Sequence, residues 1–326
     1  MTLSVSVTVE RWPVDGSFII SRGTKTHVDI VLCTISDGLH VGIGEATPIY
    51  YEGESADKCA DDISQFVAKH PKLDRAILLQ KMPRGAARNA LDCALWDLDC
   101  RKNGTSLSQH AGLPEPRPLI SAFTISLDRP EIMETKAREA ALNGHGLLKL
   151  KLSGQDDQAR VAAVHRGAPA ARLIVDANES WNDLDIAAEA ARLGPYAVEL
   201  IEQPVSAGQD HLLSGVRSPV LLCADESCHT SADVERIAPF YDAVNIKLDK
   251  AGGLTEAMAI AHAAQAMNLK IMVGCMLSTS WGIRPAFALA QLAQWVDLDG
   301  PLLLAKDRPV GFRFDSGTIA PANWKD

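Results

Sequence analysis

Short apolar runs alternate with alanine-rich segments of helical spacing over the larger, C-terminal part of the chain. Continuous apolar runs are typical of strands buried on both faces of a parallel sheet, and each such strand needs a crossover before the next. Eight strand-then-helix units follow one another, the number that closes a β/α barrel. The predicted fold class is therefore α/β, a modified (β/α)8-type TIM barrel. The runs are "LISAFTI", "GLLKLKL", "RLIVDA", "AVELIE", "PVLLCAD", "DAVNIKL", "KIMVGC" and "WVDLDG".

The first part of the chain has a different pattern, in which strands come before helices. "VDIVLCTISDGLHVGIGEA" is two apolar runs around a Ser-Asp-Gly turn and predicts a β-hairpin. Two stretches of helical spacing follow. Residues 1–112 are therefore predicted to form an α+β domain, and the proline-rich "LPEPRP" marks its boundary with a barrel over 113–300. The last segment, 301–326, is too short for a domain and is expected to pack back onto the N-terminal domain.

Composition and charge exclude several classes of function. The chain has 326 residues and a net charge of −9 without a basic run, which argues against a nucleic-acid partner. No stretch of about 18 uncharged apolar residues predicts a membrane span, and the start lacks the order of a signal peptide. Seven cysteines without a C-x-x-C pair indicate free thiols and a cytoplasmic location. Acidic barrel enzymes often form homo-oligomers, but no segment identifies an interface.

Polar side chains occur where the predicted barrel strands end. Because the carboxyl ends of all eight strands meet at one mouth, these side chains should form a ring where barrel active sites lie. The residues are Thr124, Lys149, Lys151, Asp176, Glu202, Asp225, Lys247, Cys275, Asp297 and Asp299.

Three carboxylates on consecutive strands predict a metal site. Asp176, Glu202 and Asp225 should converge, and converging anions repel one another unless a cation joins them. Oxygen ligands with open positions suit Mg²⁺, with Mn²⁺ as the alternative. Each residue alone could instead cap the helix that follows its strand. The occurrence of all three carboxylates at equivalent positions on consecutive strands favours a metal site over three separate helix caps.

The lysines flank these carboxylates. Lys149 and Lys151 alternate with leucines and share one strand face, which could also be an ordinary solvated face. With a metal nearby, we expect Lys149 to bind a substrate anion and favour the neutral form of Lys151, the base. Lys247, on the far side of the metal, is the second base; its ordinary alternative is a pair with Asp249. Lys250 should point away.

The motifs together resemble the enolase superfamily, muconate lactonizing enzyme subgroup. "KLK", "DANES", "IEQP", "ADES" and "NIKLDKAGGLTEA" resemble that subgroup's barrel strands in order, and "GIGEATP" and "AARNALDCALWDLD" resemble its N-terminal capping domain. Sites of this superfamily use a lysine or histidine base with Mg²⁺ stabilising an enediolate. The resemblance therefore implies proton transfer at a carbon next to a carboxylate.

Several reactions of that subgroup share these residues, and the last strand distinguishes them. Asp297 and Asp299 in "DLDG" would suit a substrate ammonium group, which a dipeptide has and an N-acylamino acid lacks. The pair resembles that of dipeptide epimerases of murein recycling. The implied activity is Mg²⁺-dependent 1,1-proton transfer at the α-carbon of the C-terminal residue, from L-Ala-D-Glu to L-Ala-L-Glu.

The resemblance also implies a pocket for the dipeptide. Thr124 and Cys275 would line it, Arg22 and Lys25 are candidates to contact the glutamate side chain, and the loop at 50–55 would cover it. Three alternatives stay open: an N-acylamino acid racemase, an o-succinylbenzoate synthase, and a non-catalytic dipeptide-binding barrel.

Overall fold

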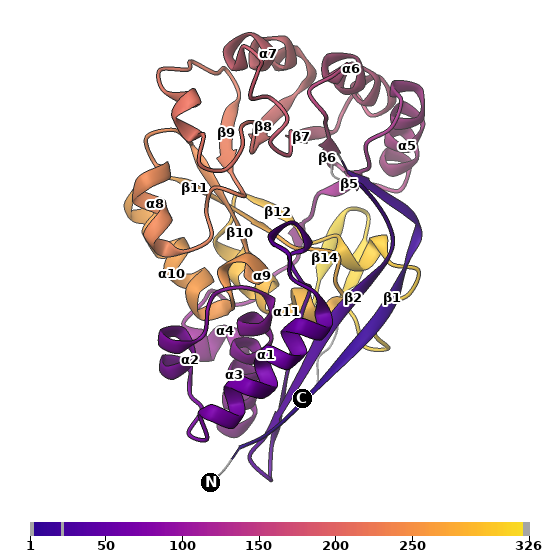
Figure 1. The fold of residues 1–326 in the computed structure, drawn as a ribbon. Coiled ribbons are helices and arrows are strands. Elements are labelled where there is room, and N and C mark those ends of the chain that lie inside the picture. Colours follow the sequence, from indigo (N-terminus) through magenta and orange to yellow (C-terminus); the bar gives the residue numbers. More distant parts are fainter. Residues whose placement is uncertain (1–2, 21–22, 322–326) are drawn as a thin grey trace.

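The computed structural model describes residues 3–20 and 23–321 (Figure 1). Its N-terminal part is an antiparallel sheet of β1 (Ser4–Ile20), β2 (Gly23–Ser36) and β3 (Val41–Ala46), in that order. The short helix η1 (Tyr50–Glu52) and four α-helices follow: α1 (Ala56–Lys69), α2 (Arg75–Lys81), α3 (Ala86–Asn103) and α4 (Leu107–Ala111). The long β1–β2 ribbon reaches from these helices to the barrel, where the Leu127 amide donates to the Ile19 carbonyl over 3.1 Å (Figure 1).

Eight parallel strands form the barrel, which confirms the predicted fold class. Neighbouring strands pair in chain order, from β5 to β12. The strands are β5 (Phe123–Ile125), β6 (Leu147–Lys151), β7 (Arg172–Asp176), β8 (Val198–Glu202), β9 (Leu221–Ala224), β10 (Ala243–Lys247), β11 (Lys270–Gly274) and β12 (Trp295–Asp297).

Helices lie between the strands of this sheet in chain order and after the last one. They are α5 (Pro130–Leu142), α6 (Asp157–Gly167), α7 (Ile186–Leu193), α8 (Ser231–Ile237), α9 (Leu248–Ala251), α10 (Leu254–Ala266) and α11 (Ser280–Leu289), with the short helices η2 (Gly194–Tyr196), η3 (Asp210–Leu213), η4 (Ala290–Leu292) and η5 (Gly300–Leu303). Only η3 lies between β8 and β9, so one expected crossover helix is reduced to a single turn. None of the helices in the described ranges is long and apolar enough to cross a membrane.

The first predicted barrel run, "LISAFTI", is two strands rather than one. β4 (Leu119–Ile120) pairs with β14 (Thr318–Ala320), which also pairs with β13 (Arg313–Asp315), whereas β5 joins the barrel. The chain changes partners between them, because the Ser121 amide donates to Gly317 and the Ala122 amide to Val296. The last segment also reaches the N-terminal sheet, where Leu304 forms a bridge with Val14. The boundaries at 112 and 300 stay predictions.

The barrel interior has an apolar floor beneath a charged mouth. Side chains alternate along each strand, so the inward positions form successive layers. On β6, Leu147 lies in the floor layer, and Lys149 and Lys151 follow on the same face. On β7 and β8, Asp176 and Glu202 likewise lie two residues after the floor residue of their strand and on the same face. The floor residues are Ala122, Leu147, Ile174, Leu200, Cys223, Ala243, Met272 and Trp295.

Candidate active site

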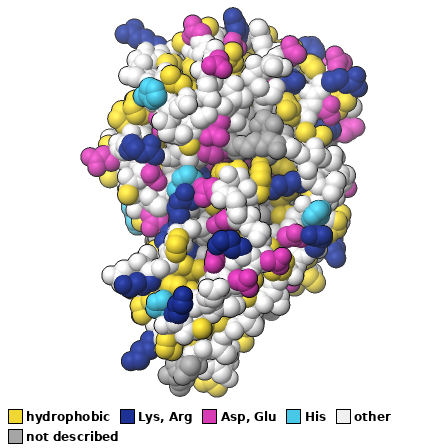
Figure 2. Space-filling view, viewed as in Figure 1, with side chains coloured by type: hydrophobic (Ala, Val, Ile, Leu, Met, Phe, Trp, Pro, Cys, Tyr) yellow, Lys and Arg dark blue, Asp and Glu magenta, His cyan; other side chains and the backbone are white. Residues whose placement is uncertain are grey.

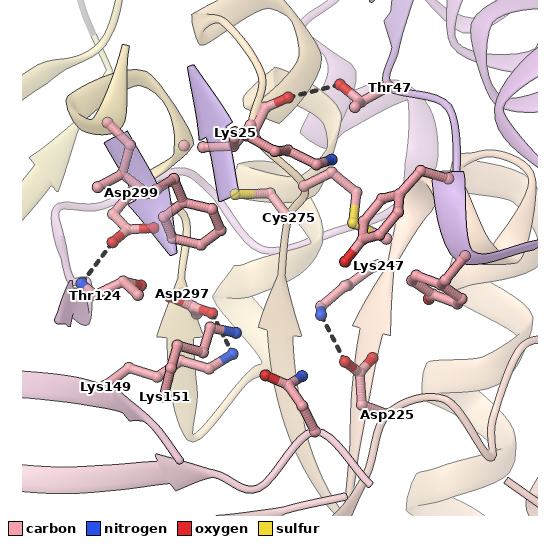
Figure 3. Close-up of a pocket in the computed structure, with 18 of the residues that line it drawn as sticks. Lys25, Thr47, Thr124, Lys149, Lys151, Asp225, Lys247, Cys275, Asp297 and Asp299 are labelled. Carbon is pink, nitrogen blue, oxygen red and sulfur yellow. Dashed lines mark hydrogen bonds and ion pairs between the residues drawn. The ribbon is translucent and has the colours of Figure 1, made fainter. Parts of the chain in front are cut away.

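One pocket at the mouth of the barrel brings together most of the predicted site residues (Figure 3). Asp176 and Glu202 lie beneath its lining and have no exposed surface. Arg22 lies outside the described residues. The predicted residues that line the pocket are Lys25, Thr124, Lys149, Lys151, Asp225, Lys247, Cys275, Asp297 and Asp299. Acidic and basic side chains are mixed over the outer face shown in Figure 2.

The three carboxylates are linked through lysines. Lys151 Nζ lies 2.6 Å from Asp176 Oδ2, and Lys247 Nζ lies 2.6 Å from Asp225 Oδ2. Burial opposes the ionised form of Asp176, but the lysines outweigh it and lower its pKa to about 2. Burial and the neighbouring negative charge of Asp176 raise the pKa of Glu202 to about 7. The lysines and the surroundings of the site therefore do not fully stabilise the negative charge of all three carboxylates.

This donor set fits a hard divalent cation. Within the described part of the chain, no three His, Cys, Asp or Glu side chains are gathered closely enough to enclose an ion, because lysine ammonium groups lie among the carboxylates. The carboxylates nevertheless come from three neighbouring strands, and the raised pKa of Glu202 marks charge that a cation would relieve. Asp176, Glu202 and Asp225 are the residues that could hold it.

Two of the four lysines at the mouth are completely enclosed. Lys149 Nζ lies 2.7 Å from both Glu202 Oε2 and Asp297 Oδ2. Burial disfavours the ammonium form of Lys149, but Asp297 and Glu202 outweigh it and raise its pKa well above the usual value. Lys250 Nζ lies 2.5 Å from Asp225 Oδ1 and also donates to the Cys228 carbonyl.

Lys250 does not line the pocket, in agreement with the expectation, but its contact with Asp225 was not predicted. Strand alternation would turn its side chain away from that of Lys247, but β10 ends at Lys247 and α9 begins at the next residue. The helical turn brings Lys250 back to the second oxygen of Asp225. The alternative partner for Lys247 is wrong, because Lys247 pairs with Asp225 and Asp249 accepts hydrogen bonds from the Thr47 amide and from Asn89 Nδ2.

Two further polar residues that sequence reasoning missed hold the carboxylates in place. Asn245 Nδ2 donates to Glu202 Oε1 over 2.7 Å, and its position two residues before Lys247 on the same strand was a usable signal. Gln203 Oε1 accepts from the Asp225 amide over 2.8 Å. Nothing in the pattern identifies Gln203, because it follows the end of β8 in a left-handed conformation (φ 38°).

Asp297 and Asp299 both line the pocket, but they have different partners. Asp297 pairs with Lys149, whereas Asp299 Oδ2 accepts from the Thr124 amide over 2.7 Å and so links the end of β12, the last barrel strand, to β5, the first (Figure 3). Burial, then the negative charge of Asp297, raises the pKa of Asp299 to about 7. Cys275 lies beside them, and burial raises the pKa of its thiol well above the usual value. A thiol with a raised pKa is uncharged and a poor nucleophile, so Cys275 contributes a small neutral side chain to the pocket lining.

Residues of the N-terminal domain form the roof of the pocket. Lys25 Nζ lies 3.8 Å from the centroid of the Tyr50 ring, and burial lowers the pKa of Lys25 to about 8. Tyr50 and Tyr51, from the predicted covering loop, line the pocket. The next residue, Glu52, anchors that loop, since it lies 2.8 Å from Arg84 Nη1 and 2.9 Å from His229 Nε2.

A β/α barrel with a strand-and-helix cap, and with lysines and carboxylates at its mouth, defines the enolase class of protein. Residues 133–318 match the family described as "Enolase C-terminal domain-like". Residues 2–112 match "Mandelate racemase / muconate lactonizing enzyme, N-terminal domain". The chain belongs to the mandelate racemase/muconate lactonizing enzyme family of the enolase superfamily.

Similar proteins are racemases and epimerases. An L-Ala-D/L-Glu epimerase of Escherichia coli is 40% identical over 97% of this chain and 99% of its own length. An N-acetyl-D-glutamate racemase of a Pseudoalteromonas species is also 40% identical, over 90% and 93%. The protein is accordingly an enzyme, an isomerase of the racemase and epimerase class.

Solved structures with the same fold contain dipeptides. An enolase family member from Agrobacterium tumefaciens, with homology to dipeptide epimerases, has a TM-score of 0.94, 47% identity and 98% coverage of both chains, and was solved with sodium and L-Ala-L-Glu. A dipeptide epimerase from Cytophaga hutchinsonii, complexed with Mg and D-Ala-L-Val, has a TM-score of 0.91 and 27% identity over 98% of this chain and 94% of its own.

Proposed function

We propose that this protein is a dipeptide epimerase that inverts the α-carbon of the C-terminal residue, with L-Ala-D-Glu and L-Ala-L-Glu as its substrates. The observation that carries the proposal is the pair of pocket-facing lysines, Lys151 and Lys247. They end two different strands of the barrel, and each is paired with a different carboxylate. Inversion needs one group that removes a proton from one face of the carbon and a second group that delivers a proton to the other.

Lys151 and Lys247 exchange these roles between the two directions. In one direction Lys151 takes the α-proton and Lys247 returns one to the opposite face; in the other direction Lys247 takes it and Lys151 returns one. Lys149 keeps its charge because three carboxylates surround it, so it is suited to stabilise negative charge that develops on the substrate. The pocket floor and the Tyr50–Tyr51 roof limit the access of water.

Asp176, Glu202 and Asp225 would hold Mg²⁺, and Mn²⁺ is the alternative. The bound ion would supply positive charge beside the substrate carboxylate. The support is the buried oxygen donor set of this chain, together with the Mg in the Cytophaga hutchinsonii complex.

The proposed dipeptide orientation places its ammonium group at Asp297 and Asp299, beside Thr124 and Cys275. Lys25 then faces the side-chain carboxylate, since it is the predicted cation that the structure places in the roof. Activity in the cytoplasm stays a prediction from the sequence, as does assembly into a homo-oligomer.

Proton NMR of L-Ala-D-Glu in D₂O with the enzyme and Mg²⁺ tests the proposal. We expect loss of the glutamate α-proton signal together with the appearance of L-Ala-L-Glu. Exchange without inversion would leave only one working base and contradict the two-base assignment. If no dipeptide of a panel shows α-proton exchange or inversion, the proposal that the substrate is a dipeptide is contradicted.

N-acyl-glutamate racemisation is the second candidate, favoured by the relative from Pseudoalteromonas. An N-acyl group has no positive charge, so only a dipeptide gains from an ionised Asp297. We expect Asp297→Asn to slow dipeptide turnover more than N-acetylglutamate turnover, measured as kcat/KM for both. Equal activity of the variant and wild type on both substrates would favour the racemase.

A further inference from the structure

Gly274 ends β11 beside Lys247, and its backbone does not explain why the residue is glycine. The parallel ladder pairs Lys247 with Gly274 and Asn245 with Met272. Gly274 is absent from the glycines of positive φ, so an L side chain is compatible with its backbone conformation. Close packing of neighbouring side chains is the remaining reason for glycine at a strand end.

The neighbours of Gly274 are the two functional side chains of β10. A Cβ atom added at residue 274 would lie 2.8 Å from Asn245 Oδ1, 3.0 Å from Asn245 Nδ2 and 3.1 Å from Lys247 Cε. The first of these distances is shorter than a Cβ contact can be, and the other two are tighter than most. An added methyl group would therefore displace the Asn245 amide, the Lys247 chain, or both.

Both side chains are buried and hold fixed positions. Asn245 Nδ2 donates to Glu202 Oε1 over 2.7 Å, and Lys247 Nζ donates to Asp225 Oδ2 over 2.6 Å. Their residues are 0% and 7% exposed, so neither can move outward into solvent without leaving its partner. The absence of a side chain at residue 274 therefore leaves room for the Lys247 chain and for the Asn245 amide.

We infer that Gly274 is a positioning residue for Lys247 and sets the reach of one base only. The inference rests on the proposed function, in which Lys151 and Lys247 serve opposite faces of the α-carbon. Lys151 pairs across its ladder with Asp176, and none of the three atoms nearest an added Cβ at residue 274 belongs to Lys151. Crowding at Gly274 should therefore slow proton transfer at Lys247 more than at Lys151, whereas a shift of Asn245 would act through Glu202 on both transfers alike.

Rates of epimerisation cannot reveal such one-sidedness. The equilibrium constant fixes the ratio of kcat/KM in the two directions, so any variant slows both directions in proportion. The equilibrium constant places no such constraint on the rate at which the α-proton exchanges with D₂O without inversion. For a diastereomer whose α-proton faces Lys151, removal and return both occur at Lys151, whereas inversion also needs Lys247.

The experiment compares Gly274→Ala with wild type and with Gly146→Ala, the same substitution at a glycine where an added Cβ meets nothing within 4 Å. Each purified diastereomer is incubated with the full-length enzyme and Mg²⁺ in D₂O, and NMR and mass spectrometry follow exchange and inversion. Lys247→Ala identifies the diastereomer that faces Lys151, because only that one continues to exchange.

We expect Gly274→Ala to raise the ratio of exchange to inversion by about tenfold or more for the Lys151-facing diastereomer, since a displacement of about 1 Å at a catalytic group can cost about a hundredfold. The other diastereomer should lose exchange and inversion together. With Asn245 and Lys247 both replaced by alanine, Gly274→Ala should add nothing, because neither crowded side chain is then present. Gly146→Ala should match wild type.

Equal slowing of exchange for both diastereomers, with an unchanged ratio, would overturn the inference and leave Gly274 a packing residue. So would a Gly274→Ala enzyme that matches wild type. If Gly274→Ala does not fold, it is remade with Asn245→Ala, which leaves only the contact with Lys247, and the one-sided change relative to Asn245→Ala alone must persist. A wild type that exchanges neither α-proton would contradict the proposed function and this inference with it.

Discussion

Two buried carboxylates, Asp225 at the mouth of the barrel and Asp249 at the junction with the N-terminal domain, have opposite electrostatic states. At the mouth, Asp225 has lysine nitrogens 2.6 Å and 2.5 Å from its two oxygens, and Lys247 and Lys250 lower its pKa well below the usual value although burial opposes this. At the junction, Asp249 accepts hydrogen bonds from the Thr47 amide and from Asn89 Nδ2. Burial raises the pKa of Asp249 to about 7.

The difference teaches that burial alone does not identify a functional carboxylate in this protein. Asp92, also at the junction, bonds to the amide and hydroxyl of Thr255, and burial raises its pKa as well. The donors to Asp92 and Asp249 are neutral, so these two contacts between the domains do not require an ionised carboxylate. Lysine partners at the mouth keep Asp176 and Asp225 ionised, and so keep charge available for a ligand.

The largest expected effect is the loss of a lysine that faces the pocket. Lys151→Ala should lower epimerisation in both directions by about 10²- to 10⁴-fold, the usual contribution of a positioned acid or base. Exchange should survive for the diastereomer whose α-proton faces Lys247. NMR in D₂O measures both quantities.

Lys136→Ala is the matched control, because Lys136 lies half exposed on α5 and does not line the pocket. It should leave turnover unchanged. Normal turnover by Lys151→Ala would contradict the two-base assignment and, with it, the functional difference between mouth and junction.

Removal of the metal should have the next largest effect. EDTA should abolish turnover and added Mg²⁺ should restore it. Asp225→Asn should weaken Mg²⁺ binding by at least about tenfold, measured by titration calorimetry, and slow turnover with it. Asp249→Asn, an equally conservative change of a buried aspartate, should bind Mg²⁺ as wild type does. Activity that is indifferent to EDTA, or equal weakening by both substitutions, would contradict the metal assignment.

The sequence predicts the mouth much better than the junction. The eight apolar runs and the polar residues at their ends are local features, so the eight-stranded barrel and the strand-end residues that line its pocket could be located from the pattern, whereas Lys25 came only from the family resemblance. The contact of Lys250 with Asp225 was missed because the period changes from strand to helix within three residues. The Thr47–Asp249 contact joins residues 202 apart, and no local pattern encodes such a distant partner.

The smallest expected effect concerns stability at the junction. Because the pKa of Asp249 is about 7 in the folded protein and 3.8 is its ordinary value, the folded state binds the extra proton between these pH values. The contribution of Asp249 to stability is therefore complete below pH 4 and declines as the pH rises to 7, by at most about 1.4 kcal/mol per pH unit. Asp249→Asn keeps an oxygen for both donors and has no proton to lose.

Urea unfolding from pH 5 to 8 checks this expectation. Asp249→Asn should gain stability relative to wild type as the pH rises to 7, and the difference should stay constant above it, because both wild-type states are then ionised. Asp61→Asn, an exposed change on α1, should run parallel to wild type. Parallel curves for Asp249→Asn as well would mean that Asp249 is already ionised at low pH. The junction would then hold its charge as the mouth does, and the contrast between the two regions would be lost.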